Sequence, residues 1–278
     1  MAKKSSGLQF LGLSLSGGKS NRSAMAVIEY FPDKEKVFLK TLHEKIQSDK
    51  IKSSDVKICE FLDKYKSTAG SCTVDVPLKL PKCIRCRLSC PGYEKCREPE
   101  IIWLWKKYRQ NKKKTKKLFT PYTERCVETL FTQDLEEPFY KDHALGANLA
   151  PVVARALYLQ KQIQMPLYEC FPQLTLWRIG RSLGISKVQL RRHKHAVEGV
   201  YVRSLILEAF SKKNISFFYG QEVHAMTMHL ESFEAYLCAL TGLYKYLKLT
   251  EKKPSDFPKK EAWVEFPKKD TLVHRQKS

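Results

Sequence analysis

Four acidic residues that lie far apart in the sequence could together form a metal-dependent site: Asp75, Glu169, Glu231 and Glu234. Asp75 ends a short β-rich run at 71–76 that Pro77 closes, and Glu169 ends a second run at 166–170. Glu231 and Glu234 are three residues apart and therefore share one face of a predicted helix. Two-metal hydrolysis of a phosphodiester needs three or four carboxylates around cations roughly 4 Å apart, so these residues are candidate catalytic ligands. The alternative for Glu231 and Glu234 is that they are ordinary solvated helix acids.

A second candidate metal site is a group of four cysteines, Cys83, Cys86, Cys90 and Cys96, with a Pro-Gly turn after the third. Four thiolates suit tetrahedral Zn²⁺ or an iron–sulfur cluster, and their spacing does not separate the two. The alternative is a set of free surface thiols. The other five cysteines are scattered singly through apolar stretches, which indicates reduced thiols in a cytoplasmic protein rather than a disulfide scaffold.

The chain is strongly basic, with 50 Lys and Arg against 29 Asp and Glu in 278 residues and a net charge of +21. Such an excess predicts a polyanionic partner, with nucleic acid first, although a basic surface that only maintains solubility is the alternative. No run of 18 apolar residues indicates a membrane span. The candidate nucleic-acid-binding residues lie between 106 and 117, in a stretch without acids: Lys106, Lys107, Arg109, Lys112, Lys113, Lys114, Lys116 and Lys117.

Three aromatic residues near that basic stretch, Trp103, Trp105 and Tyr108, could stack on unpaired bases or could simply pack in the core. A second basic cluster spans 191–195, and its two histidines are expected on a solvated surface rather than on a metal.

The elements that would position these residues follow from the hydrophobic pattern. Runs at 8–15, 24–31 and 36–42 predict an antiparallel meander, and the capping residues at 53–55 predict a helix to about 65. That helix would be a crossover, so the strand at 73–76 should lie parallel to the first. Further helices are predicted to about 164 and at 172–181, 195–210 and 228–247. Small residues on the last helix, Ala235, Cys238 and Gly242, would let it approach the sheet closely.

The pattern also suggests how the chain is divided. Residues 1–80 and 143–250 would form the two parts of one α/β domain, and residues 81–142 would form a Cys-rich, basic insertion with little regular periodicity. Residues 251–278 would be a basic tail, with Trp263 packing back onto the body.

Several segments together resemble the domain-of-unknown-function 429 family of predicted ribonuclease H-like nucleases: FLGLSLSG at 10–17, VDVPL at 74–78, YECFP at 168–172 and EAYLCALT at 234–241. FTPY at 119–122 and GANLAP at 146–151 resemble segments of its cysteine-bearing members. The resemblance implies a ribonuclease H-like fold with a mixed five-stranded sheet and flanking helices. It also implies cleavage of nucleic acid with Mg²⁺ or Mn²⁺, with Asp75 and Glu234 on acidic positions and Glu231 where an acid or His commonly sits.

One position departs from that family. Its first strand usually presents an acid two residues after the glycine, where this chain has Ser14, and a neutral hydroxyl is a poor ligand for Mg²⁺. The sequence therefore predicts a metal-dependent nuclease acting on DNA or RNA, with a catalytically inactive nucleic-acid-binding or scaffold protein as the alternative. It leaves the choice between DNA and RNA and the oligomeric state open.

Overall fold

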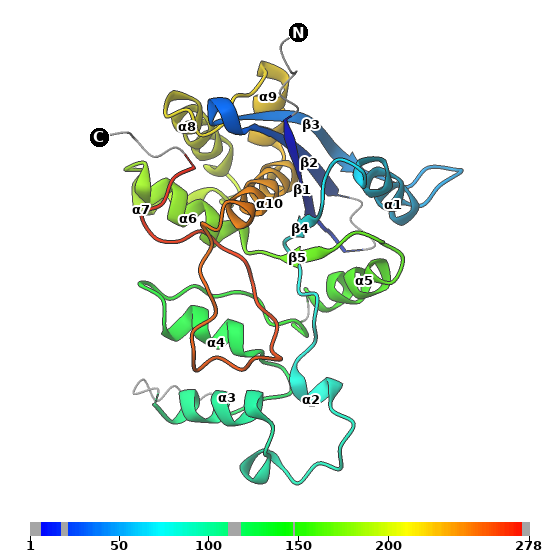
Figure 1. Ribbon diagram of the computed structural model, residues 1–278, viewed down its shortest axis with the longest axis vertical. Helices are drawn as coiled ribbons and strands as arrows, with labels where there is room; N and C mark the ends of the chain where they lie inside the picture. Colours follow the sequence, from blue (N-terminus) through cyan, green and yellow to red (C-terminus); the bar gives the residue numbers. More distant parts are fainter. Residues whose placement is uncertain (1–6, 18–21, 111–117, 147, 274–278) are drawn as a thin grey trace.

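In the computed structural model, which describes residues 7–17, 22–110, 118–146 and 148–273, the chain forms an α/β fold around a five-stranded mixed sheet (Figure 1). The strands are β1 (Leu8–Ser14), β2 (Ser23–Phe31), β3 (Lys36–Ile46), β4 (Cys72–Val74) and β5 (Leu167–Glu169), in the spatial order β3-β2-β1-β4-β5. β2 is antiparallel to β1 and β3, whereas β4 is parallel to both β1 and β5. The predicted meander and the crossover through α1 (Ser54–Tyr65) are confirmed.

Helices cover both faces of the sheet because the strand side chains alternate between two hydrophobic clusters. Leu11 and Leu13 of β1 pack with buried residues of α1 and α5 (Ala150–Gln160), whereas Phe10 packs on the side of α10 (Leu230–Tyr246). Figure 1 shows α10 on one side of the sheet and α1 and α5 on the other. α10 is buried along nearly its whole length and is the central helix of the larger cluster.

α10 lies directly on β1 because position 12 is a glycine. A Cβ at Gly12 would fall 2.1 Å from the carbonyl oxygen of Ala235 and 2.2 Å from the amide nitrogen of Ala239. A Cβ at Gly242, one helical turn further along, would fall 2.7 Å from Oγ1 of Thr73. The predicted close approach of this helix is therefore present, and it depends on glycines in both partners.

The remaining helices of this layer are α6 (Pro172–Ser182), α7 (Lys187–Arg192), α8 (Gly199–Lys212) and α9 (Gly220–Met228). Two predicted boundaries differ from those observed. The helix predicted at 195–210 begins at Gly199, and the helix predicted at 228–247 is α10 alone, beginning at Leu230. His229 separates α9 from α10 because its backbone is extended, with φ −113° and ψ 113°.

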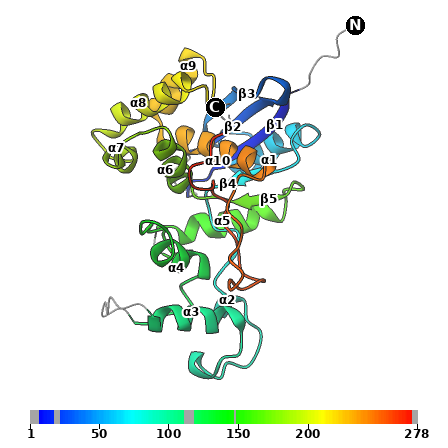
Figure 2. The ribbon, with the colours of Figure 1, turned by 60° about the vertical axis from the view of Figure 1, so that its left-hand side comes forward.

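The insertion contains more regular structure than its sequence pattern predicts. It forms α2 (Lys82–Arg85), the 3-10 turn η2 (Tyr93–Lys95), α3 (Pro99–Gln110) and α4 (Cys126–Gln133); a second 3-10 turn, η1 (Pro32–Lys34), connects β2 and β3. Figures 1 and 2 both place α2 and α3 at the end of the molecule farthest from β3. Buried residues of α3 and α4 nevertheless belong to the same hydrophobic cluster as α10.

The segment after α10 joins the insertion to the sheet instead of extending as a separate tail. The ring of Phe257 lies 5.4 Å from that of Trp103, and the ring of Phe266 lies 5.4 Å from that of Phe131. The amide of Glu265 donates to the carbonyl oxygen of Glu169 at 2.7 Å, beside the last residue of β5. Trp263 packs against Phe257 and Phe266 of the same segment and, as predicted, against the main hydrophobic cluster of the body.

Candidate active site

The candidate active site begins at the edge of the sheet where three parallel strands end. Ser14 is the last residue of β1, Asp75 directly follows β4, and Glu169 is the last residue of β5. The Ser14 hydroxyl donates to Oδ2 of Asp75 at 2.6 Å, and the amide of Leu15 donates to Oδ1 of the same carboxyl group at 3.0 Å. Ser14 thus occupies the expected place in the site, where it orients Asp75 by a hydrogen bond.

α10 brings Glu234 to the same edge, because the contact of Gly12 with Ala235 fixes the first turns of the helix against β1. The Glu234 residue is 9% exposed. Burial and then the charge of Glu234 raise the pKa of Asp75 to about 6, against the hydrogen bonds from Ser14 and Leu15 and the charge of Lys141, which lower it. Asp75 and Glu234 are therefore close enough for their negative charges to repel each other.

Two lysines enter this acidic site. Lys194 Nζ lies 2.5 Å from Oε1 of Glu234, and Lys141 Nζ lies 3.5 Å from the backbone carbonyl oxygen of Asp75. Burial lowers the pKa of Lys194, but the carboxylates of Glu234, Asp75 and Asp142 outweigh this effect, and the net pKa is raised. The Lys194 ammonium thus pairs with Glu234 and also experiences the charges of Asp75 and Asp142.

These lysines were not identified from the sequence as site residues. Lys194 belongs to the basic cluster at 191–195, which was expected on a solvated surface, and Lys141 lies at the end of the insertion in a stretch without a recognisable motif. The prediction that both histidines of this cluster lie on a solvated surface is wrong for His193, which is fully buried. Burial lowers the pKa of His193 to about 4, and its Nδ1 lies 2.8 Å from the carbonyl oxygen of Leu190.

Glu169, a predicted catalytic ligand, instead forms a buried ion pair that was not apparent from the sequence. Its two carboxylate oxygens accept hydrogen bonds from Nη1 and Nη2 of Arg125, each at 2.8 Å. Arg125 also donates from Nε to Oε1 of Glu128 at 2.8 Å, and the side chains of Arg125, Glu128 and Glu169 are 0%, 2% and 2% exposed. This ion pair connects the beginning of α4 to the end of β5, so Glu169 anchors the insertion to the sheet.

Glu231 is the fourth predicted ligand. It is half-buried in the first turn of α10, where its charge raises the pKa of Arg203, although burial dominates and the net pKa of that arginine is lowered. Arg203 donates to the backbone carbonyl oxygens of His193 and Thr227. Ser14, Asp75 and Glu234 are thus connected by a hydrogen bond and by charge. Glu169 pairs with Arg125 and lies 3.7 Å from Nζ of Lys141, which also contacts the backbone of Asp75. Glu231 acts on Arg203, as Glu234 does.

The four clustered cysteines lie on α2, in the loop after it and next to η2. Burial, and after it the thiols of Cys96, Cys90 and Cys86, raise the pKa of Cys83 to about 11. The four thiols are thus neighbours, and all nine cysteines of the chain are free. Among the described residues, however, no three His, Cys, Asp or Glu side chains are arranged as ligands around a common point.

The predicted nucleic-acid surface is only partly within the described residues. Lys106 and Arg109 are exposed on α3, whereas Lys107 pairs with Asp134 at 2.6 Å. The remaining five predicted contacts lie outside the described residues: Lys112, Lys113, Lys114, Lys116 and Lys117.

The three aromatic residues near the basic stretch have two different environments. Trp103 is buried in the core, so for this residue the structure favours core packing over stacking on unpaired bases, the two possibilities that the sequence left open. Trp105 belongs to a partly exposed aromatic cluster, in which its ring stacks on that of Tyr108 at 5.5 Å and packs against Tyr93 and Phe119. Tyr93 and Tyr108 are 39% and 41% exposed. This cluster packs the cysteine-bearing loop against α3.

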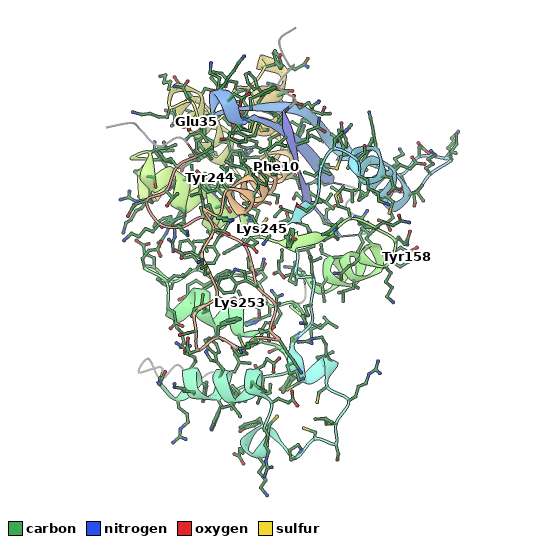
Figure 3. All side chains as sticks on the ribbon, in the orientation of Figure 1. Phe10, Glu35, Tyr158, Tyr244, Lys245 and Lys253 are labelled. Atoms are coloured by element: carbon green, nitrogen blue, oxygen red, sulfur yellow. The ribbon has the colours of Figure 1, made fainter. Side chains whose placement is uncertain are left out.

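An open hollow of about 400 Å³ lies at the other end of the parallel strands, lined in part by Phe10, Tyr168 and Lys245. Phe10 and Lys245 are labelled in Figure 3. Lys245 Nζ is 4.2 Å from the centre of the Tyr168 ring and 2.5 Å from Oε1 of Glu265. The hollow is thus separate from the carboxylates at the strand ends.

No family model, curated protein sequence or solved structure matches this chain. Within the described part of the chain, no helix combines the length and the apolar character needed to cross a bilayer.

Proposed function

We propose that the protein is a metal-dependent nuclease with a ribonuclease H-like fold, which acts on DNA or RNA at the sheet edge formed by Ser14, Asp75 and Glu234. The observation that carries this proposal is the convergence of Asp75 and Glu234 at the ends of parallel strands, although 159 positions separate them in the sequence. The element order and the mixed five-stranded sheet are those that the family resemblance implies. The net charge of +21 favours a polyanionic substrate.

The residues at this edge fit one hard cation better than two. Mg²⁺ is commonly held by one or two carboxylates together with substrate phosphates, and Asp75 and Glu234 form such a pair. Glu169 does not extend the pair, because both of its oxygens already accept from Arg125. Asp75 and Glu234 would hold the cation, which would stabilise the negative charge that develops on the phosphodiester in the transition state.

The other residues of the site would position the carboxylates and attract the substrate. Ser14 and the amide of Leu15 fix the orientation of Asp75 through both of its oxygens. The exposed cations of α3, Lys106 and Arg109, would contact the phosphate backbone, and the partly exposed Tyr93 and Tyr108 offer faces for unpaired bases.

A second candidate function, nucleic-acid binding without cleavage, is favoured by two observations. Ser14 stands where the family that the sequence resembles usually has an acid, and Lys194 already pairs with Glu234. In that case the fold and the basic surface would serve as a binding module, and salt-sensitive binding without turnover is expected.

For the cysteine loop, we propose a structural Zn²⁺ or iron–sulfur centre held by Cys83, Cys86, Cys90 and Cys96. The support is the proximity of the four thiols. Metal binding would then draw the loop together into a ligand set, which couples binding to folding.

The test of the proposed activity is cleavage of labelled single-stranded, duplex and branched DNA and RNA in the presence of Mn²⁺. Wild type, Asp75→Asn and Ser14→Asp are compared, with Asp33→Asn in η1 as a control for loss of an exposed acid. Cleavage that Asp75→Asn abolishes and Asp33→Asn retains is the expected result. Binding by wild type without cleavage, with cleavage only in Ser14→Asp, would instead establish the second candidate.

A further inference from the structure

Lys194 provides a positive charge at the point where the proposed function requires a metal ion. Its Nζ is 2.5 Å from Oε1 of Glu234, and the charges of Asp75 and Asp142 act on the same ammonium group. Glu234 is nearly buried, so without a cation its charge would repel Asp75 in a poorly solvated site. The Lys194 ammonium pairs with Glu234 and so offsets the charge of that carboxylate.

The backbone around Lys194 is fixed, whereas its side chain remains partly exposed. His193, the preceding residue, is fully buried, and its carbonyl oxygen accepts from Nη1 of Arg203 at 2.6 Å. Gly199 lies so close that a Cβ there would be 2.9 Å from that same oxygen. The Lys194 side chain itself is 43% exposed. Because the backbone at Lys194 is anchored and its side chain is partly exposed, the ammonium group can move away from Glu234 without a change in the fold.

We propose that Lys194 is an internal counter-cation of the site, which neutralises Glu234 in the protein without bound metal and competes with a divalent cation for the same carboxylate. A metal ion and an ammonium group cannot both lie against Oε1 of Glu234 without strong repulsion, so the ammonium must move before a metal binds. The choice of Mg²⁺ or Mn²⁺ as the competing ion rests on the proposed function. The role of Lys194 as the cation paired with Glu234 rests on the structure.

The test measures Mn²⁺ binding to the full chain in the absence of nucleic acid, by electron paramagnetic resonance of free Mn²⁺. Wild type is compared with Lys194→Met, and Lys194→Gln serves as a second, polar replacement. Loss of the competing charge-assisted bond should tighten Mn²⁺ binding about tenfold or more. The gain should disappear in Lys194→Met combined with Glu234→Gln, because the released carboxylate is then absent.

The matched control is Lys245→Met. Lys245 also pairs at 2.5 Å with a nearly buried carboxylate, that of Glu265, and it is exposed to a similar degree, 31%. It lies on α10 at the end opposite Glu234 (Figure 3). This change removes the same charge from the chain and should leave Mn²⁺ binding unaltered.

A second measurement distinguishes competition from a merely structural contact. Lys194→Met should lower the melting temperature without metal, and Mn²⁺ should raise the melting temperature of this variant more than that of wild type. Unchanged or weaker Mn²⁺ binding in both Lys194 variants, or an equal gain in Lys245→Met, would overturn the proposal. If the proposed nuclease activity is wrong, no variant cleaves nucleic acid, yet the gain in Mn²⁺ affinity in Lys194→Met is still expected.

Discussion

Replacing Arg125 with Met should destabilise the protein severely, because two buried carboxylates would lose their partner. Arg125 makes two hydrogen bonds to Glu169 and one to Glu128, all at 2.8 Å, and none of the three side chains is more than 2% exposed. Breaking a buried ion pair by removing one partner typically costs about 3–5 kcal/mol. Lys141 remains 3.7 Å from Glu169, so the lower end, about 3 kcal/mol, is expected.

The measurement is the free energy of unfolding in urea for Arg125→Met and for the double variant Arg125→Met/Glu169→Gln. The double variant leaves one buried carboxylate without its arginine instead of two, so it should be more stable than Arg125→Met alone. Arg178→Met is the matched control. Arg178 is buried to a similar degree, but its partners Glu136 and Glu251 are 25% and 36% exposed, and water can solvate them after the change. A cost of about 1 kcal/mol is expected there.

Acid should reduce the effect of Arg125→Met. Burial alone would raise the pKa of Glu128, but Arg125 and His143 outweigh it and the pKa is lowered. The stability that the ionised Glu128 contributes is therefore present at neutral pH and is lost as the pH falls. Without Arg125, the buried Glu128 carboxyl would protonate more readily, so the cost of the substitution should be smaller in acid. An Arg125→Met variant that loses less than about 1 kcal/mol at pH 7, or no more than Arg178→Met, would refute the assignment of Arg125 as the anchor of the insertion.

Three further predictions follow from the sheet edge, the helix contact and the cysteine loop. Gly12→Ala should cost about 3 kcal/mol of unfolding free energy, the upper end of the usual cost of overpacking, because its Cβ would meet two backbone atoms of α10. Gly70→Ala, with nothing within 4 Å, should be nearly neutral, and equal stabilities of the two variants would contradict the close approach. The pKa of Asp75 is raised to about 6, so the stability that its protonated form contributes is present below about pH 4 and is lost as the pH rises through about 6. Between these pH values, wild type should therefore lose unfolding free energy relative to Asp75→Asn. Parallel curves of unfolding free energy against pH for the two proteins would contradict this. Protein purified under reducing, anaerobic conditions should contain metal by elemental analysis, and Cys83→Ser should lose it while Cys59→Ser should not; metal-free wild type would exclude the proposed centre.

The sequence predicted the sheet well because its signals are local. Short β-rich runs bounded by turn signals predicted the strands around positions 11 and 27. The capping residue Ser53 marked the start of α1, and the structure confirms it, because the Ser53 side chain accepts a hydrogen bond from the amide of Val56. The order of these elements then fixed the parallel arrangement of β1 and β4. Asp75 was recognisable as a candidate site residue because it ends a β-rich run that Pro77 closes two residues later.

The charged partners in the site could not be predicted, because each depends on a contact between distant segments. Arg125 and Glu169 are 44 residues apart, and nothing near either residue indicates that they pair. Lys194 lies in a run of basic residues, a pattern typical of a solvated surface. Only the fold shows that this run, between α7 and α8, places Lys194 against Glu234 of α10. The predicted helix 228–247 was too long at its start because His229 interrupts a hydrophobic pattern that continues through both α9 and α10.

The outer strands of the sheet bear on the tendency of the chain to aggregate. An uncovered edge strand presents unpaired amide and carbonyl groups that can recruit a second chain. Here the segment after α10 forms a parallel bridge from Glu265 to Cys170 beside β5, and Phe217 exchanges backbone hydrogen bonds with Val37 and Leu39 of β3. Both outer strands are therefore partly covered by the chain itself. The C-terminal segment consequently protects the protein from edge-to-edge association, and shortening the chain before Glu265 would remove this protection from the strand that carries Glu169.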